Sequence, residues 1–256
     1  MVSISEYLNL ADIKKGDILD VASDTLSITL FFRKYGMKFS MDELLDELKE
    51  KVGTEGTLLI RCFNWDFCKG ETFDYKRTKS QVGSLGNAAL QRGDFKRTKH
   101  PIYSWMVWGK DTEYLCSLDN KRAFGNDTPW EYLEKNNAKM IRIGTTSNPA
   151  FTQMHCVEQE LNVPYRFEKV FRANYIEEDE SISMKEYSMF VRDLERKNEI
   201  NYDYLYRLER KGICITKKYK EELQIFIIDI KEACNLMRND LLNGKSDEWV
   251  IVGEKI

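Results

Sequence analysis

The chain of 256 residues is poor in the patterns that mark a bound metal or a membrane protein. Its six cysteines are scattered without a C-x-x-C pair, so we expect no zinc site and interpret them as reduced thiols. No apolar run is long enough to cross a bilayer, and the start, MVSISEYLNLADIKKGD, lacks the basic-then-apolar order of a signal peptide. These absences predict a cytoplasmic protein with no membrane partner.

A surplus of positive charge is absent as well. The formal net charge is −3, whereas a general nucleic-acid binder needs a positive surface to neutralise phosphates. Neither a G-x-G-x-x-G nor a P-loop pattern occurs, so the two commonest nucleotide-binding motifs are missing. We therefore expect no nucleic-acid partner, and any basic patch must be local.

The chain also lacks a linker rich in proline, glycine or serine, and it contains no internal repeat. We therefore expect one α/β domain over residues 1–256. Strand and helix patterns alternate over residues 1–175, with strands at 57–63 (TLLIRCF) and 139–143 (KMIRI). Residues 176–256 are expected to form a mainly helical C-terminal section, with helices at 202–210 and 221–242. The stretch Thr128-Pro129-Trp130-Glu131 has the form of a helix start.

Only two histidines are present, and histidine is the side chain best suited to accept a proton near neutral pH. His155 lies in FTQMHCVEQE, where Glu158 follows three residues later. On a helix this spacing places the carboxylate beside the imidazole, where it can orient the ring. An ordinary surface pair has the same spacing, so both interpretations stay open. The other histidine, His100, precedes a proline and is either functional or a packing residue bonded to the main chain.

Basic and hydroxyl side chains gather in the middle of the chain. Arg77, Thr78, Lys79 and Ser80 stand close to a glycine turn at Gly83. Hydroxyls and backbone amides near such a turn bind phosphate oxygens, while lysine and arginine supply charge. A solvated surface has the same composition, so the pattern alone does not distinguish a phosphate-binding turn from a solvated surface.

Six segments in a fixed order resemble the aminoglycoside 3-N-acetyltransferase family: KGDILDVASD, GTEGTLLI, WDFCKGETFDYKRTKSQVGSLG, FKRTKHPIYS, AFGNDTPWEYL and FTQMHCVEQ. The resemblance implies an α/β fold with a central mixed sheet flanked by helices, distinct from the GNAT acetyltransferases. It also implies transfer of an acetyl group, or another short acyl group, from acyl-CoA to an amine without a metal.

The same resemblance implies roles for particular residues. It makes His155 the catalytic base and Glu158 its partner. It places two segments near the CoA, represented by Ser23, Asp24, Thr25, Leu26, Arg77, Thr78, Lys79, Ser80 and Gly83.

Departures from the family pattern concern the acceptor. Tyr103 stands where the H-P-T-H-S pattern of antibiotic-modifying members has its second histidine, and Ala22-Ser23-Asp24 replaces their His-Ser-Ser. The segments FCKG, RTKHPIYSW and YSMFVRDLE resemble the branch of surface-polysaccharide (O-antigen or capsule) biosynthesis. We therefore expect an amino-sugar acceptor linked to a nucleotide, contacted by His100, Tyr103, Arg97 and Arg192.

Three questions stay open at this point. Acetylation of aminoglycoside antibiotics is the alternative activity, and an inactive binding scaffold is the alternative without catalysis. The sequence also leaves open whether the chain forms a homo-oligomer.

Overall fold

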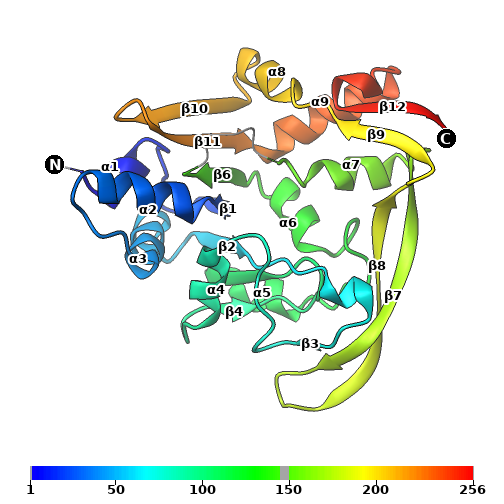
Figure 1. The fold of residues 1–256 in the computed structure, drawn as a ribbon, viewed down its shortest axis with the longest axis horizontal. Coiled ribbons are helices and arrows are strands. Elements are labelled where there is room, and N and C mark those ends of the chain that lie inside the picture. The colour runs from blue at the N-terminus through cyan, green and yellow to red at the C-terminus, as the bar shows by residue number, and fades with distance from the viewer. Residues whose placement is uncertain (1, 145–149, 256) are drawn as a thin grey trace.

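A seven-stranded mixed β-sheet organises the chain in the computed structural model, which describes residues 2–144 and 150–255 (Figure 1). Strands β6, β1 and β2 are parallel, and each remaining strand runs antiparallel to its neighbour. In spatial order the sheet consists of β10 (Cys214–Tyr219), β11 (Leu223–Asp229), β6 (Lys139–Ile143), β1 (Ile18–Ser23), β2 (Thr57–Arg61), β5 (Trp105–Gly109) and β4 (Lys96–Arg97).

Helices cover both faces of this sheet, as Figure 1 shows for α1–α3 on one side and α6, α7 and α9 on the other. The first face carries α1 (Ile4–Asn9), α2 (Thr25–Lys34), α3 (Met41–Val52) and α4 (Ser84–Leu90). The second carries α5 (Thr112–Ser117), α6 (Pro129–Lys135), α7 (Met154–Glu160), α8 (Tyr204–Arg210) and α9 (Ile230–Leu242). Successive strand residues point to opposite faces, so Ile141 joins the first core and Met140 the second.

The remaining strands form two small sheets. β7 (Arg166–Ile176) and β8 (Ile182–Arg192) make a long hairpin that runs along one side of the molecule (Figure 1), and β3 (Phe73–Asp74) pairs with β7. β9 (Arg196–Ile200) pairs with β12 (Val250–Lys255). Two short 3₁₀ helices, η1 (Asp66–Lys69) and η2 (Ser246–Glu248), complete the described structure.

Local sequence signals account for much of this architecture. The predicted central mixed sheet with flanking helices is confirmed, including strands at 57–61 and 139–143. α6 begins where its sequence predicts, because the Thr128 hydroxyl accepts a hydrogen bond from the Glu131 amide at 3.2 Å and Pro129 occupies the first helical position. None of the helices in the described ranges is both long and apolar enough to span a bilayer.

The prediction of a mainly helical C-terminal section is wrong. Residues after 176 contribute five strands, β8 to β12, and two α-helices within the described residues. The helix expected at 221–242 is strand β11 followed by helix α9. β11 lies between β10 and β6, and the run Ile225–Ile228 is apolar at every position, so it lacks the alternation that indicates a strand.

Candidate active site

The carboxyl ends of the parallel strands bring the predicted catalytic and cofactor segments to one edge of the sheet. Ser23 ends β1, Arg61 ends β2, and the segment that leads into α7 follows β6. Strand β1 comes first in the chain but lies between β2 and β6, so the order of strands reverses at β1. Ligands of open α/β sheets bind outside the carboxyl ends of the strands at such a reversal.

His155 and Glu158 form a close pair on α7. The Nδ1 atom of His155 lies 2.6 Å from Oε2 of Glu158, and the imidazole is 15% exposed while the carboxylate is fully buried. Nε of Arg166, at the start of β7, lies 2.6 Å from the same carboxylate oxygen. Because Glu158 is held from two sides, it can orient the ring, and a neutral imidazole that donates from Nδ1 has an unprotonated Nε2.

An aromatic ring covers one side of His155. The Phe124 ring packs edge-to-face against the imidazole with a centroid separation of 5.6 Å. Phe151, four residues before His155 in the chain, lies before α7 begins and is buried in the core. Phe124 is therefore the ring that limits access of water to this side of the imidazole.

A buried ion pair supports the start of α7, and sequence reasoning missed it. Arg61 of β2 donates to both carboxylate oxygens of Asp20 of β1, at 2.5–3.2 Å, and Nη1 of Arg61 lies 3.4 Å from the Thr152 hydroxyl. The indole of Trp105 donates to the same carboxylate at 3.2 Å. The available signal was one charged residue inside each of two otherwise apolar strands, since buried charges in proteins are usually paired.

The segment Ser23–Leu26 turns directly from β1 into α2. The Asp24 carboxylate accepts from the Ser27 amide at 3.1 Å and from the Ser27 hydroxyl at 2.8 Å, so it caps the helix. Thr25 is buried, whereas Leu26 is 67% exposed. Gly83 has φ +137°, and a Cβ built there would lie 3.3 Å from the Ser23 carbonyl oxygen. Two of the predicted cofactor segments are therefore in contact.

The Thr78–Ser80 turn is ordered by its own polar groups. The Thr78 hydroxyl accepts from the Asp74 amide at 2.7 Å, and the Ser80 amide donates to the Asn87 side chain at 2.7 Å. The side chain of Lys79 is exposed. Arg77 forms ion pairs with Asp74 and Glu180 at 2.8 and 3.2 Å, so its charge is already balanced.

The residues expected to contact the acceptor do not come together at one surface. His100 is buried, and its Nδ1 accepts from the amides of Ile102 and Tyr103 at 3.3 and 3.2 Å. Burial lowers the pKa of His100 to about 3 and raises the pKa of Tyr103 to about 12, so both side chains are neutral near pH 7. This placement favours the packing role of His100 over a contact with substrate.

The two arginines of the same set are also apart from each other. Arg97 is buried and donates to the hydroxyl of Ser104 and to the carbonyls of Tyr75 and Thr78 at 2.8–3.1 Å. These bonds fix the position of the Thr78–Ser80 turn from its buried side. Arg192 is exposed at the end of β8 and donates to the Asn198 carbonyl at 3.3 Å. Arg97 therefore supports the turn, whereas Arg192 lies at the end of the β7–β8 hairpin.

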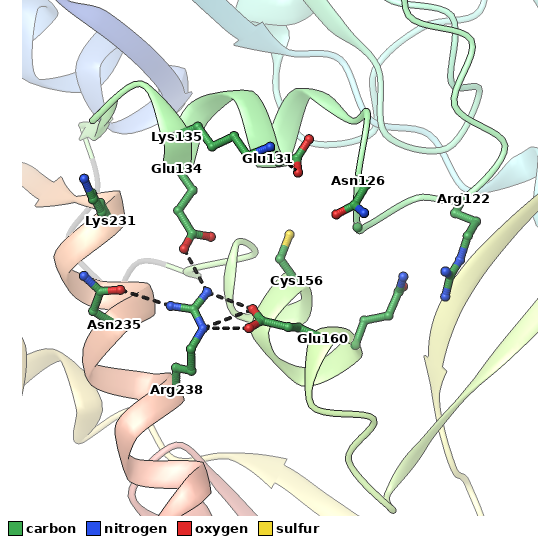
Figure 2. Close-up of a pocket in the computed structure, with 12 residues that line it drawn as sticks. Arg122, Asn126, Glu131, Glu134, Lys135, Cys156, Glu160, Lys231, Asn235 and Arg238 are labelled. Carbon is green, nitrogen blue, oxygen red and sulfur yellow. Dashed lines mark hydrogen bonds and ion pairs between the residues drawn. The ribbon is translucent and has the colours of Figure 1, made fainter.

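A cavity of about 710 Å³ lies beside α7, between α6 and α9 (Figure 2). Cys156 lines it, but its neighbour His155 is not among the described lining residues. Arg238 of α9 bridges Glu134 of α6 and Glu160 of α7 at 2.9 and 2.8 Å, as Figure 2 shows. The charged side chains of the cavity are largely paired with one another, so this cavity offers no surplus of carboxylates to a polycation.

A metal centre is not formed by the residues that the structure describes. Among them, no three histidine, cysteine, aspartate or glutamate side chains lie together as possible ligands. The six cysteines in these ranges are free thiols.

Comparison of the sequence with known families identifies its family. Residues 34–241 match the model of a family described as aminoglycoside 3-N-acetyltransferase. The chain belongs to this family. The aminoglycoside 3-N-acetyltransferase-like protein is accordingly an acyltransferase that uses acetyl-CoA to acetylate an amine. A search of the curated proteins found no match to the chain.

Solved structures share the fold of this acetyltransferase. AAC-IIIb in a binary complex with CoASH has a TM-score of 0.76 at 14% identity, and the match covers 94% of this chain and 96% of that one. AAC-VIa bound to sisomicin has a TM-score of 0.76 at 16% identity with the same coverage. The YokD protein from Bacillus subtilis has a TM-score of 0.72 at 18% identity and covers 94% of this chain and 98% of that one.

Proposed function

We propose that the protein transfers an acetyl group from acetyl-CoA to an amine of an aminoglycoside-type amino sugar, with His155 as general base. One observation carries the proposal: the imidazole of His155 is bonded to a buried carboxylate and lies in the segment that follows β6, near the reversal point of the sheet. In a family whose reaction needs a proton acceptor, this is the histidine suited to the task. His100 is unsuited because it is buried and its Nδ1 already accepts two amides.

The proposed reaction is a direct attack on the thioester. An amine is protonated in water and becomes nucleophilic only when it loses that proton. Nε2 of His155 takes the proton, directly or through one water, while Glu158 stabilises the resulting imidazolium. The amine nitrogen bonds to the thioester carbonyl carbon and loses its second proton, the carbon–sulfur bond breaks, and the CoA thiolate leaves and takes up one of the two released protons, while the other passes to solvent.

The loop after β1 supplies groups for the oxyanion of the intermediate. The amide of Asp24 donates to the Ile143 carbonyl and that of Ser27 to the Asp24 carboxylate. The amides of Thr25 and Leu26, in the first turn of α2, have no acceptor among the described residues. These two amides are therefore our candidates for the oxyanion contacts, each worth roughly 3–4 kcal/mol when well placed.

The cofactor is proposed to lie between this loop and the Thr78–Ser80 turn. Contact of Gly83 with Ser23 joins the two segments, and the exposed Lys79 is the basic side chain available for a phosphate. Arg77 is a weaker candidate because Asp74 and Glu180 already balance its charge.

The nature of the acceptor is supported by the comparisons rather than by the site. The family is described by aminoglycoside acetylation, and one relative of the same fold is bound to sisomicin. Neither finding supports the nucleotide-linked sugar of polysaccharide biosynthesis that the sequence variants suggest. Since Arg97 is buried and Arg192 lies at the end of the hairpin, the basic contacts expected for a nucleotide are also dispersed. We therefore propose an aminoglycoside as the acceptor in preference to a nucleotide-linked sugar.

A free-thiol release assay with acetyl-CoA tests the proposal. The amines to be compared are sisomicin, an amino monosaccharide without a phosphate and a nucleotide-linked amino sugar. Acetylation of sisomicin above the hydrolysis background supports the proposed acceptor. Turnover of the nucleotide-linked sugar alone would favour that sugar over an aminoglycoside as the acceptor. The absence of thiol release with every amine would contradict the proposed function.

A further inference from the structure

Arg142 lies in strand β6 at the active-site edge of the sheet. It stands in register with Ala22 of β1, one residue before Ser23, and with Phe226 of β11. Its neighbours Ile141 and Ile143 belong to the core on the α2 side, so the Arg142 side chain projects from the opposite face, as Met140 does. Arg61 on β2 and the α7 segment lie on that same side.

The guanidinium of Arg142 is partly buried, and no described residue pairs with it directly. In residues 2–144 and 150–255 it has neither an ion-pair partner nor a hydrogen-bond acceptor within bonding distance. Burial, and then the positive charge of Arg61, lower the pKa of Arg142, while Tyr204, Asp24 and Tyr202 act in the opposite direction. An arginine keeps its charge under such conditions, so among the described residues this cation is not directly paired with an anion.

Other partly or fully buried arginines of the chain differ from Arg142 in this respect. Arg61 is bonded to both oxygens of Asp20, Arg166 lies 2.6 Å from Glu158, and Arg97 is surrounded by carbonyl and hydroxyl oxygens. Each of these partly or fully buried cations has its oxygen partners within the chain. Arg142 is left with its planar donor fork available, which is the geometry that binds a phosphate or carboxylate in a bidentate manner.

We propose that Arg142 binds an oxyanion of one of the two substrates at the carboxyl ends of β6 and β1. The shared chemistry is a phosphate or carboxylate group. Its source is either a phosphate of CoA or an acidic group on the acceptor, and the experiment below separates the two. Assigning the anion to a substrate rests on the proposed function, whereas the anion site itself does not.

The test compares Arg142→Gln and Arg142→Lys with Arg33→Gln, a matched loss of charge at an exposed arginine of α2. Calorimetry measures the affinity for CoA without an acceptor. The KM is measured for amines with and without an acidic group, and inorganic pyrophosphate is added in thermal-shift scans as a probe that needs no catalysis. We expect Arg142→Gln to weaken binding of the anionic ligand by about ten- to a hundredfold, because a charged hydrogen-bonded fork is lost. The lysine variant should lose several-fold.

The outcomes assign the source. Weaker CoA binding with an unchanged KM for acidic amines identifies a CoA phosphate as the anion. Unchanged CoA binding with a raised KM for acidic amines identifies the acidic group of the acceptor. Pyrophosphate should raise the melting temperature of the wild type and leave the melting temperature of Arg142→Gln unchanged. The unliganded glutamine variant should melt no lower than the wild type, since it loses a charge repelled by Arg61.

The proposal is overturned if Arg142→Gln binds every ligand within twofold of the wild type, or if Arg33→Gln weakens binding equally. If the glutamine variant does not fold, wild-type affinity in Arg142→Lys would overturn it. CoA or pyrophosphate binding that depends on Arg142 in a protein that acetylates no amine would contradict the proposed function and leave this inference standing.

Discussion

His155 and Glu158 are the smallest unit on which the proposed chemistry depends. Replacing His155 by alanine removes the proton acceptor and leaves the buried Glu158–Arg166 pair in place. We expect the turnover number to fall by about 10²–10⁴-fold. The melting temperature should stay within a few degrees of the wild type, because His155 is partly exposed.

The assay for this variant is thiol release at saturating substrates, with calorimetry to verify that acetyl-CoA still binds. Lys218→Ala, a change at an exposed residue of the edge strand β10, serves as the control for preparation. A His155→Ala enzyme with wild-type turnover would remove His155 from the mechanism.

His100 makes a prediction about pH and stability. Its pKa is about 3 in the folded chain and near 6.5 in the unfolded chain, so below pH 6.5 the unfolded state binds a proton that the folded state excludes. Its contribution to stability is therefore complete above pH 6.5 and falls by about 1.4 kcal/mol per pH unit between 6.5 and 3. Urea unfolding at pH 7, 6 and 5 should show a steeper loss for the wild type than for His100→Asn. Equal slopes would mean that His100 is protonated in the fold.

Lys79 tests the basic turn. Its exposed ammonium is proposed to contact a phosphate of CoA, so Lys79→Ala should raise the KM for acetyl-CoA by several-fold with a smaller effect on turnover. Lys76→Ala is the matched control, because Lys76 is exposed on the same loop and pairs with Glu180. Steady-state kinetics at varied acetyl-CoA distinguish the two. Identical KM values in both variants and the wild type would make the turn an ordinary solvated surface.

At the scale of elements, α4 is held against β2 by a glycine. A Cβ built on Gly86 would lie 2.3 Å from the Arg61 carbonyl oxygen, so Gly86→Ala must push α4 away from the end of β2. We expect a loss of about 1–3 kcal/mol in the free energy of unfolding. Because Gly83 begins the same helix and touches Ser23, the KM for acetyl-CoA should rise as well.

Gly93 offers the matched control for this change. A Cβ there meets nothing within 4 Å, so Gly93→Ala should alter stability by no more than about 0.5 kcal/mol. Urea unfolding of both variants gives the comparison. Equal stability of the Gly86→Ala and wild-type proteins would show that α4 shifts without cost.

Elements with local signals could be predicted, and elements defined by their neighbours could not. Helix α3 begins at Met41 and α6 at Pro129, each behind a side chain that caps it, Ser40 and Thr128. Strand β11 was predicted as helix because its apolar run has no strand period when both faces are covered. The same limit applies to the site: the His155–Glu158 spacing was visible, whereas the contact of Arg166 with Glu158 required the fold.

At the scale of the whole molecule, acetyl-CoA binding should stabilise the native state. A ligand at a hundred times its dissociation constant adds about 2.7 kcal/mol, which for a chain of this size raises the melting temperature by roughly 5–10 °C. Thermal-shift scans with acetyl-CoA measure this directly. Acetyl phosphate, which has the acetyl group without pantetheine or nucleotide, should have little effect. An unmoved melting temperature with acetyl-CoA would favour the inactive scaffold.

The sequence alone indicated the family through its motifs and set the helical spacing of His155 and Glu158, and the resemblance to the family implied the mixed sheet, because motifs and spacing are local patterns. The tertiary structure decided which other residues meet that pair. Arg61 pairs with Asp20 on the neighbouring strand, Arg97 and His100 are buried in the core, and Arg142 has no bonded partner among the described residues. The physical reason is that burial and charge pairing are set by neighbours distant in the chain, and a linear pattern carries little record of them.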